Sequence, residues 1–215
     1  MYEVELKVRA DHDALADRLR ERGAERRGAV RQVDTYYDAP HRSFADTDEA
    51  LRLRATTPLD GGGAAAPDAR NAAPLDAGDA GAPDDDRSPT GTGARATTHE
   101  LTYKGPKVDD AAKTREEFES TVGDPDAVEA ALEALGFEPA AAVEKARRRF
   151  ELDGYAVVLD DVDGLGTFVE VETEAAAGGL DAAREGAAAV LERLGLANRE
   201  RLRSSYLGLL LDASE

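Results

Sequence analysis

Eight short segments of the chain alternate apolar and polar residues, and this period of two is typical of β-strands with one apolar face. The first contains EVELK, in which Glu3, Glu5 and Lys7 occupy every second position with apolar residues between them. The predicted strands span residues 2–9, 31–37, 50–55, 99–104, 115–122, 145–152, 155–161 and 167–174. We therefore expect a sheet with one apolar and one polar face.

Four other segments have apolar residues at helical spacing: residues 11–25, 124–139, 180–196 and 198–212. The first three have an Asp near the start and a Gly after the last apolar turn, residue types that favour helix ends. The order is strand, helix and three strands, repeated once, and LRERG in the first half resembles LEALG in the second. This repetition predicts an internal duplication.

Residues 56–98 have a different composition, rich in Gly, Ala, Pro, Asp and Thr, with Leu59 and Leu75 as the only large apolar side chains. Such a segment cannot bury enough surface to offset its ordering entropy, so it is predicted to be disordered. Closing so long a loop costs only about 2 kcal/mol more than a tight turn. The expected organisation is one domain over residues 1–215 that contains this insertion.

Charged residues gather on one face of most predicted strands, because strand residues two apart point to the same side. They are Glu3, Glu5, Lys7, Arg9, Arg52, Arg54, Arg115, Glu117, Glu119, Lys145, Arg147, Arg149, Glu151, Glu170, Glu172 and Glu174. One interpretation is the solvated face of an antiparallel sheet. The other is the interior of a closed eight-stranded barrel, with helices over the apolar outer face. We favour the barrel because these faces concentrate basic residues in an acidic chain.

The formal net charge is −18 and the sequence pI is about 4.6. Nucleic acids and anionic membrane surfaces would repel such a chain, so neither is an expected partner. The absence of cysteine excludes disulfides, thiolate metal sites and cysteine nucleophiles. No apolar run approaches the roughly 18 to 20 residues of a membrane helix, and the N-terminus lacks a signal-peptide pattern. A cytoplasmic location is therefore expected.

The abundance of Asp, Glu and Ala, and the excess of Arg over only 5 Lys, resemble the composition of halophilic, salt-adapted proteins. Dense surface carboxylates repel one another at low ionic strength, whereas salt at about 1 M screens charges within about 3 Å. We expect the melting temperature to fall when KCl is lowered from molar to millimolar concentration. An unchanged melting temperature would contradict this interpretation.

Charges inside a channel are costly unless other charges compensate them. A polyanion bound together with a divalent ion would do so, because cations bind phosphate oxygens and carboxylates bind Mg²⁺ or Mn²⁺. Phosphoryl transfer depends mostly on positioning and charge neutralisation, which this set can supply without His or Cys. The charged faces therefore indicate a metal-dependent site for a phosphorylated ligand.

The motifs EVELK, QVDTYYDAP, ALRLR, YKGP, TREEFES, VEKARRRF, LDDVDGLGTFVEVE and RLRSSYLGLL follow one another along the chain. Their order resembles that of the CYTH family, the triphosphate tunnel metalloenzymes, and EVELK resembles its ExExK signature. The start of the chain, YKGP and GLGTF look most like class IV adenylate cyclases. The resemblance implies an α+β fold, an eight-stranded antiparallel β-barrel tunnel built from a duplicated β-α-β-β-β unit, with helices packed outside.

The resemblance also implies roles for particular residues. Positions that hold Mg²⁺ or Mn²⁺ match Glu3, Glu5, Glu170 and Glu172. Positions that bind the triphosphate match Lys7, Arg52, Arg54, Lys104, Arg115, Lys145, Arg147 and Arg203, and of these Lys7, Lys145 and Arg147 are assigned to catalysis. Other tunnel positions match Glu117 and Asp160.

Three functions are compatible with such a site. A cyclase, which we place first, would convert ATP to cyclic AMP and pyrophosphate, and a hydrolase would release orthophosphate from tripolyphosphate, a nucleotide or thiamine triphosphate. A noncatalytic receptor would only bind triphosphate or polyphosphate, but an anion binder gains nothing from carboxylates without a metal. A monomer and a homodimer both remain open.

Overall fold

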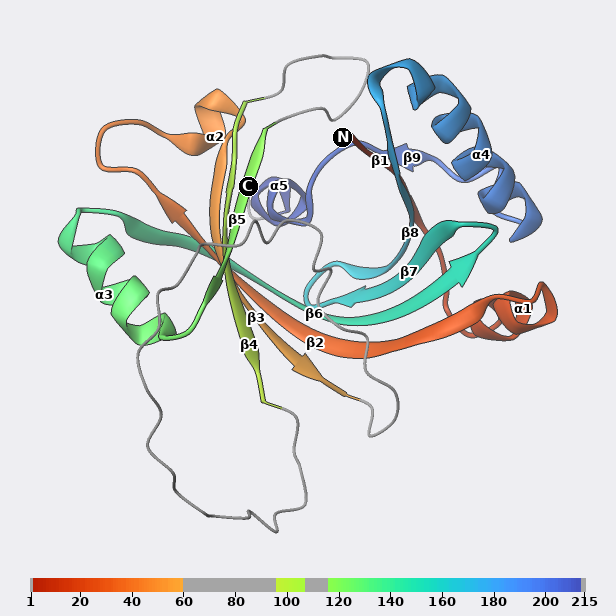
Figure 1. Cartoon of the computed structure of the whole chain (residues 1–215), viewed down its shortest axis with the longest axis horizontal. Coiled ribbons are helices and arrows are strands. Elements are labelled where there is room, and N and C mark those ends of the chain that lie inside the picture. Colours follow the sequence, from red (N-terminus) through yellow and green to blue (C-terminus); the bar gives the residue numbers. More distant parts are fainter. Residues whose placement is uncertain (1, 60–95, 107–115, 214–215) are drawn as a thin grey trace, which may run out of the picture.

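The computed structural model describes residues 2–59, 96–106 and 116–213. Within them the chain forms one antiparallel sheet of nine strands in the order β5-β4-β3-β2-β6-β7-β8-β1-β9 (Figure 1). The strands are β1 (Tyr2–Arg9), β2 (Glu25–Asp38), β3 (Ala50–Pro58), β4 (Thr98–Lys104), β5 (Glu117–Val122), β6 (Glu138–Leu152), β7 (Tyr155–Val162), β8 (Gly166–Ala175) and β9 (Arg201–Leu202). All eight predicted strands are confirmed, and β9 is an addition.

Two strands begin at least six residues before the positions that the period-two pattern predicted. β2 begins at Glu25 rather than at residue 31, and β6 begins at Glu138 rather than at residue 145. The added residues, ERRGAV and EPAAAVE, each contain only one large apolar side chain, so their alternation is weak in the sequence. The two strands pair along most of their length, and this ladder joins the first half of the chain to the second.

The helices are α1 (Leu15–Glu21), α2 (Phe44–Thr47), α3 (Pro125–Ala134), α4 (Leu180–Arg193) and α5 (Tyr206–Asp212), with a 3-10 turn at Ala177–Gly179 before α4. α1, α3 and α4 confirm three predicted helices with shorter bounds. The prediction of one helix over residues 198–212 is wrong in its first half, where Arg201–Leu202 pairs with β1 as β9. The helix begins after Ser205, whose hydroxyl caps α5 by accepting a hydrogen bond from the Gly208 N–H at 3.1 Å.

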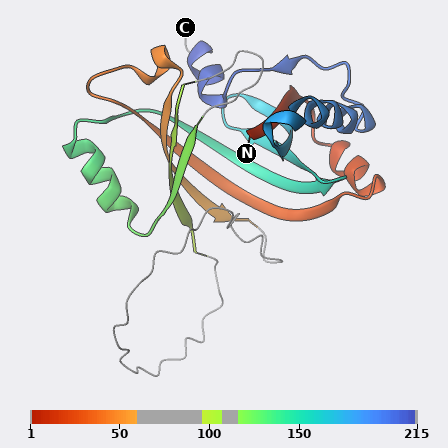
Figure 2. The ribbon, with the colours of Figure 1, turned by 45° about the horizontal axis from the view of Figure 1, so that its top comes forward.

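Apart from the short α2 between β2 and β3, the two halves of the chain repeat one order of elements, β1-α1-β2-β3-β4 and then β5-α3-β6-β7-β8, as the predicted duplication requires. The sheet curls, and α5 stands on its open side in both views (Figures 1 and 2). Within the described residues the edge strands β5 and β9 do not pair, so the predicted barrel is not closed by hydrogen bonds. Charges from the other half of the sheet nevertheless reach β1, since Lys104 of β4 lowers the pKa of Glu3 and Glu117 of β5 raises it.

The apolar outer face of the sheet is covered by helices, as predicted. α1 and α4 pack over β1, β6, β7 and β8, where Leu19 and Leu191 join the same buried cluster as Val171. α2 and α3 pack over the other half of the sheet, where Leu132 joins Leu53. Helices thus cover both halves of the outer face of the sheet, and the opposite face, which carries the buried charged residues, turns inward.

α5 packs on the opposite side of the sheet from the other helices. Its first residue, Tyr206, is buried with Val143, Val162 and Phe168, which belong to β6, β7 and β8. These residues have the same strand parity as the inward charged residues. The C-terminal helix therefore contributes to the inner surface rather than to the outer cover.

Both ends of residues 56–98, the segment predicted to be disordered, belong to strands. β3 continues to Pro58, and Thr56 pairs with Thr98 at the start of β4. Residues 60–95 of the insertion lie outside the described residues.

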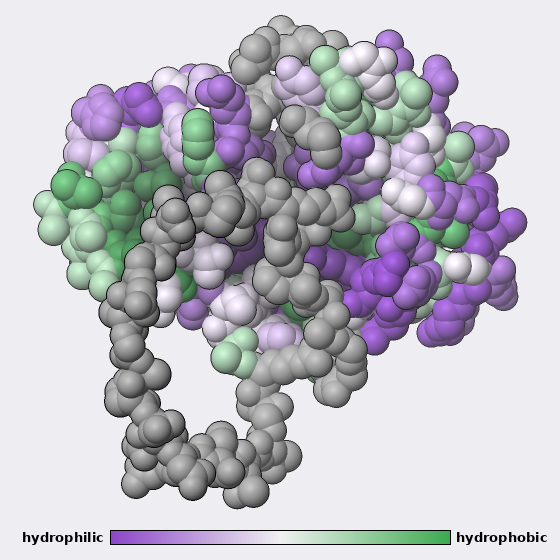
Figure 3. Space-filling model, in the orientation of Figure 1, coloured by the Kyte–Doolittle hydropathy of each residue, from purple (hydrophilic) through white to green (hydrophobic). Residues whose placement is uncertain are grey.

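Hydrophilic side chains dominate the part of the visible face over α1, and apolar ones gather near α3 (Figure 3). Among the helices that the structure describes, none has both the length and the apolar character needed to cross a membrane.

Candidate functional site

The inward face of the curved sheet buries an unusual number of charged side chains. They are Lys7, Asp34, Arg52, Lys145, Arg147, Asp160 and Glu170. Asp160 is 0% exposed, and Lys7 and Glu170 are each 3% exposed. The alternative of a solvated outer face is therefore wrong for these positions, which form the buried inner surface of the curled sheet.

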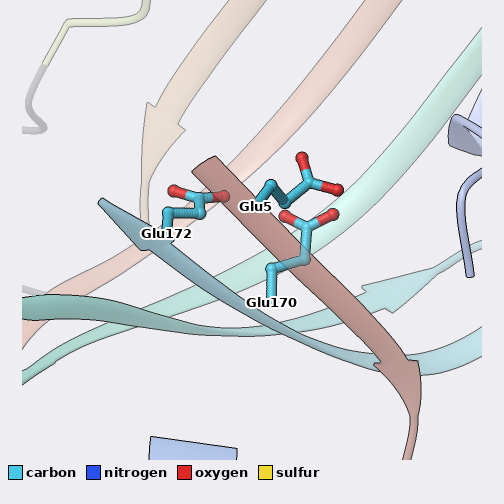
Figure 4. A group of neighbouring side chains, drawn as sticks. All are labelled: Glu5, Glu170 and Glu172. Carbon is cyan, nitrogen blue, oxygen red and sulfur yellow. The ribbon is translucent and has the colours of Figure 1, made fainter. Parts of the chain in front are cut away.

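Three carboxylates meet where β1 pairs with β8. The register sets Glu5 opposite Glu172 and Lys7 opposite Glu170. One oxygen of each of Glu5, Glu170 and Glu172 lies within 4.8 Å of the others (Figure 4). Three hard oxygen donors at this separation fit a divalent ion such as Mg²⁺ or Mn²⁺. Glu3, the fourth predicted ligand, lies one position further along the same face of β1 and outside this group.

The pKa values of these acids reflect burial and their mutual repulsion. Burial raises the pKa of Glu172 to about 8, and although Arg147 lowers it, Glu170, Glu3 and Glu5 add to the rise. The pKa of Glu3 is also raised, chiefly by burial. A carboxylate that resists ionisation in this way is the kind that a bound cation would relieve.

Arg147 and Lys7 are the cations closest to the acid group. Arg147 donates to both oxygens of Asp160, at 2.7 and 2.5 Å, and to Glu170 at 2.6 Å. The Nζ atom of Lys7 lies 3.1 Å from Glu5 and 3.0 Å from Glu170. Burial alone would raise the pKa of Glu170, but Arg147 and Lys7 outweigh it and hold that pKa well below its usual range.

A second group of cations surrounds Asp34 of β2, a residue that was not among the predicted site residues. Arg54 donates to its two oxygens at 2.5 and 2.7 Å, and Lys145 donates at 3.4 Å. Against the effect of burial, these cations hold the pKa of Asp34 well below its usual range. Its place in the alternating run QVDTYYD was the available signal, because Asp34 has the same parity as Gln32 and Tyr36.

Arg52 stands between Asp34 and the carboxylates of β4 and β5. Its Nη2 atom donates to the Thr102 hydroxyl at 3.0 Å and lies 3.9 Å from Glu100 and 4.0 Å from Glu119. Its buried Nε has no hydrogen-bond partner among the described residues. Arg52 therefore has one hydrogen-bond donor, Nε, that is not used by the described residues.

The remaining predicted residues differ in their surroundings. Lys104 donates to Glu117 at 2.7 Å, which links β4 to β5. Arg203 is exposed and is the first residue after β9. Arg115 lies outside the described residues. The structure thus brings together most, but not all, of the predicted triphosphate ligands on one inner surface.

Tyr206 of α5 is a further member of this surface that sequence reasoning missed. Its hydroxyl donates to Asp160 at 3.0 Å, and the Nζ of Lys7 lies 4.3 Å from its ring centroid. Burial, together with Glu170 and Asp160, raises the pKa of Tyr206 above its ordinary range. No period-two pattern could have found it, because it reaches the site from a helix.

The chain matches known proteins along almost its whole length. Residues 1–206 match the CYTH domain. A protein of Methanocaldococcus jannaschii with the name "Putative adenylate cyclase" is 28% identical over 211 residues, which cover 97% of this chain and 98% of that protein. The solved structure of the PH1819 protein from Pyrococcus horikoshii has a TM-score of 0.75 and 32% identity, with 99% of each chain covered.

A structure from Hippeastrum is similar in fold at lower identity. It is a "putative adenylyl cyclase" that "reveals a dominant" triphosphatase activity. The TM-score is 0.62 and the identity 17%, with 99% of this chain and 96% of that chain covered. At this identity the likeness concerns the fold alone.

Proposed function

Because this chain belongs to the CYTH domain family, we propose that it is a divalent-metal-dependent enzyme that acts on a triphosphate bound along the inner face of the sheet. The observation that carries the proposal is the group of Glu5, Glu170 and Glu172 with oxygens within 4.8 Å of one another. Buried cations adjoin this group, and Arg147 lies 2.6 Å from Glu170. Acids and bases in this arrangement suit a metal ion and a polyphosphate together.

Glu5, Glu170 and Glu172 would hold the metal, with Glu3 as an additional ligand from the same face of β1. A divalent ion bound there supplies Lewis acidity and a template for phosphate oxygens. Lys7 would then be shared between these carboxylates and the substrate, since it already lies within 3.1 Å of both Glu5 and Glu170. The carboxylates thereby orient the Lys7 ammonium group.

The remaining cations would bind and orient the phosphate chain. Arg147 is held in one orientation by Asp160, and Arg54 by Asp34, through paired hydrogen bonds. Arg52, Lys104 and Lys145 extend the cationic surface, and we assign Arg115 and Arg203 to the same role from the family resemblance. Since phosphoryl transfer needs chiefly positioning and neutralised charge, these residues would provide most of the catalysis.

Two reactions fit this site. In a cyclase the ribose 3′ oxygen of ATP attacks the α-phosphorus and pyrophosphate leaves, a proposal supported by the name of the Methanocaldococcus relative. In a triphosphatase water attacks the terminal phosphorus, whose bond to the bridging oxygen breaks, so that orthophosphate forms and the diphosphate part of the substrate departs; this proposal is supported by the activity stated for the Hippeastrum protein. We place the cyclase first and the triphosphatase second. A noncatalytic triphosphate receptor is the third candidate.

Product analysis separates these functions. The purified protein is incubated at high salt with Mg²⁺ or Mn²⁺ and with ATP, tripolyphosphate or thiamine triphosphate. Cyclic AMP with pyrophosphate identifies the cyclase, and metal-dependent orthophosphate identifies the triphosphatase. Tight binding without turnover would instead identify a receptor. The absence of both binding and turnover with every substrate would overturn the proposal.

The affinity for tripolyphosphate should depend on the charge of Lys145. Burial, with Arg147 and Arg54 nearby, lowers the pKa of Lys145 to about 7. Its ammonium form therefore prevails below neutral pH and is lost above it, so affinity should fall by up to about thirtyfold between about pH 6 and about pH 8.5. Titration calorimetry of wild type and Lys145→Arg checks this. The arginine stays protonated, so a fall of equal size in both proteins would contradict the role of Lys145.

A further inference from the structure

The C-terminal segment contributes one buried side chain, Tyr206, to the inner surface of the sheet. Tyr206 is 6% exposed and begins α5, directly after the capping residue Ser205. Its ring packs against that of Phe168 of β8 in an edge-to-face arrangement, with centroids 5.0 Å apart and an interplanar angle of 61°. This contact holds the ring in a defined orientation on the inner face.

Two lysines from distant strands lie against this one ring. The Nζ of Lys7, on β1, is 4.3 Å from the ring centroid, and the Nζ of Lys145, on β6, is 5.3 Å from it. Both distances lie within the roughly 6 Å over which an ammonium is attracted to an aromatic face. The segment touches Lys7 a second time, because Lys7 Nζ donates to the backbone carbonyl of Ser204 at 3.5 Å.

The hydroxyl of Tyr206 makes a separate link to a third cation. It donates to Asp160 Oδ2 at 3.0 Å, the same oxygen that accepts a hydrogen bond from Arg147 Nη2. Asp160 therefore accepts hydrogen bonds from two side chains, Arg147 and Tyr206, and these bonds restrict the rotation of its carboxylate. The orientation of Arg147 depends in turn on Asp160.

A lysine side chain is a point charge on a flexible stem, and like charges repel one another within this channel. The structure supplies carboxylates to hold Lys7, and one longer contact with Asp34 to hold Lys145. An aromatic face next to both lysines attracts their ammonium groups without neutralising them. It also leaves their remaining N–H donors available to phosphate oxygens.

We propose that Tyr206 is a positioning residue, whose ring holds the Lys7 and Lys145 ammonium groups and whose hydroxyl steadies the Asp160–Arg147 pair for triphosphate binding. The proposal deepens the proposed function and rests on it for the identity of the ligand. It assigns to α5 a role in the geometry of the cations rather than only in covering the channel. Tyr206 itself transfers no proton and touches no reacting atom.

The positions of the lysines can be tested without any substrate. The chain has only 5 lysines, so lysine ε-methylene groups labelled with ¹³C give a spectrum that can be resolved. Ring currents from Tyr206 should shift the signals of Lys7 and Lys145 upfield in wild type. These shifts should persist in Tyr206→Phe and disappear in Tyr206→Leu. Upfield shifts that remain unchanged in Tyr206→Leu would overturn the proposal.

The effect on binding is measured with tripolyphosphate and Mg²⁺ by calorimetry. We expect Tyr206→Leu to bind about tenfold more weakly than wild type, and Tyr206→Phe to bind about threefold more weakly. Leu209→Ala is the matched control, because Leu209 packs in the same apolar cluster on α5 as Tyr206. Its melting temperature should fall while its affinity stays near that of wild type.

The outcomes separate the two proposals. Equal losses of affinity in Leu209→Ala and Tyr206→Leu would mean that Tyr206 acts only through helix packing, and would refute the positioning role. A wild-type protein that shows the lysine shifts but neither binds nor turns over ATP, tripolyphosphate or thiamine triphosphate would refute the proposed function, while the ring contacts would stand as structure. A full affinity in Tyr206→Leu would refute the positioning role alone.

Discussion

Replacing Glu172 with glutamine should lower metal-dependent turnover by about 100-fold or more and leave the metal-free fold at least as stable as wild type. Turnover is lost because the amide removes one of three charges that would hold the metal. Stability is kept because burial and the neighbouring acids Glu170, Glu3 and Glu5 raise the pKa of Glu172 to about 8. At neutral pH the metal-free protein already carries a largely neutral side chain there, which glutamine resembles.

The stability difference between Glu172→Gln and wild type should depend on pH in a defined direction. The folded-state pKa of Glu172 lies above its ordinary value of 4.5, so the folded protein binds an additional proton between about pH 4.5 and about pH 8. The contribution of Glu172 to stability therefore falls as pH rises through this window, and the variant lacks that fall. Without metal, the melting temperature of Glu172→Gln minus that of wild type should grow from acidic to mildly alkaline pH.

The control for Glu172→Gln is Glu144→Gln, which changes a carboxylate on the exposed side of β6. Glu144 is 44% exposed and pairs with Arg31. Its replacement should leave turnover within about twofold of wild type, because an exposed ion pair contributes little. Full turnover in Glu172→Gln, measured at saturating Mg²⁺, would remove Glu172 from the metal site.

Replacing Arg147 with methionine should lower the free energy of unfolding by about 3 to 5 kcal/mol and abolish turnover. Arg147 is 7% exposed and satisfies Asp160 and Glu170, which are themselves 0% and 3% exposed. Methionine fills similar space but leaves two buried carboxylates without their common partner. Urea unfolding at constant high salt measures the change.

Arg31→Met is the matched control for Arg147→Met. Arg31 pairs with Glu144 at 2.6 Å on the outer side of the β2–β6 ladder, and its side chain is 55% exposed. Its loss should cost no more than about 1 kcal/mol. Adding Glu170→Gln to Arg147→Met should restore part of the lost stability, since one unpaired charge is removed. If Arg147→Met and Arg31→Met had equal free energies of unfolding, the buried ion pairs of Arg147 would contribute no more to stability than the exposed pair of Arg31.

The local pattern of the sequence was sufficient for much of the fold. Alternation in EVELK separates Glu3, Glu5 and Lys7 from the apolar residues between them, and the structure places both sets on opposite sides of β1. The same rule holds for Lys145 and Arg147 on β6. The alternation of apolar and polar residues was weakest where side chains are small, as in residues 138–144, and there pairing with β2 decides the strand bounds.

The acid group required information that no local pattern contains. Glu5 and Glu172 are separated by 167 positions in the sequence, and they meet because β1 and β8 pair in one particular register. A shift of that register by one residue would turn one set of carboxylates outward. The family resemblance named these residues together, whereas periodicity could say only that each one shares a face with its own strand neighbours.

By itself, the sequence determined the strands, three helices, the duplicated order and the charged face of each strand, because these depend on residue spacing within one element. Only the tertiary structure decided that the charged faces turn inward, that Asp34 collects Arg54 and Lys145, and that Tyr206 lies against two lysines. Such contacts join residues far apart in the chain. Their distances follow from strand order, register and the docking of α5, which local spacing does not encode.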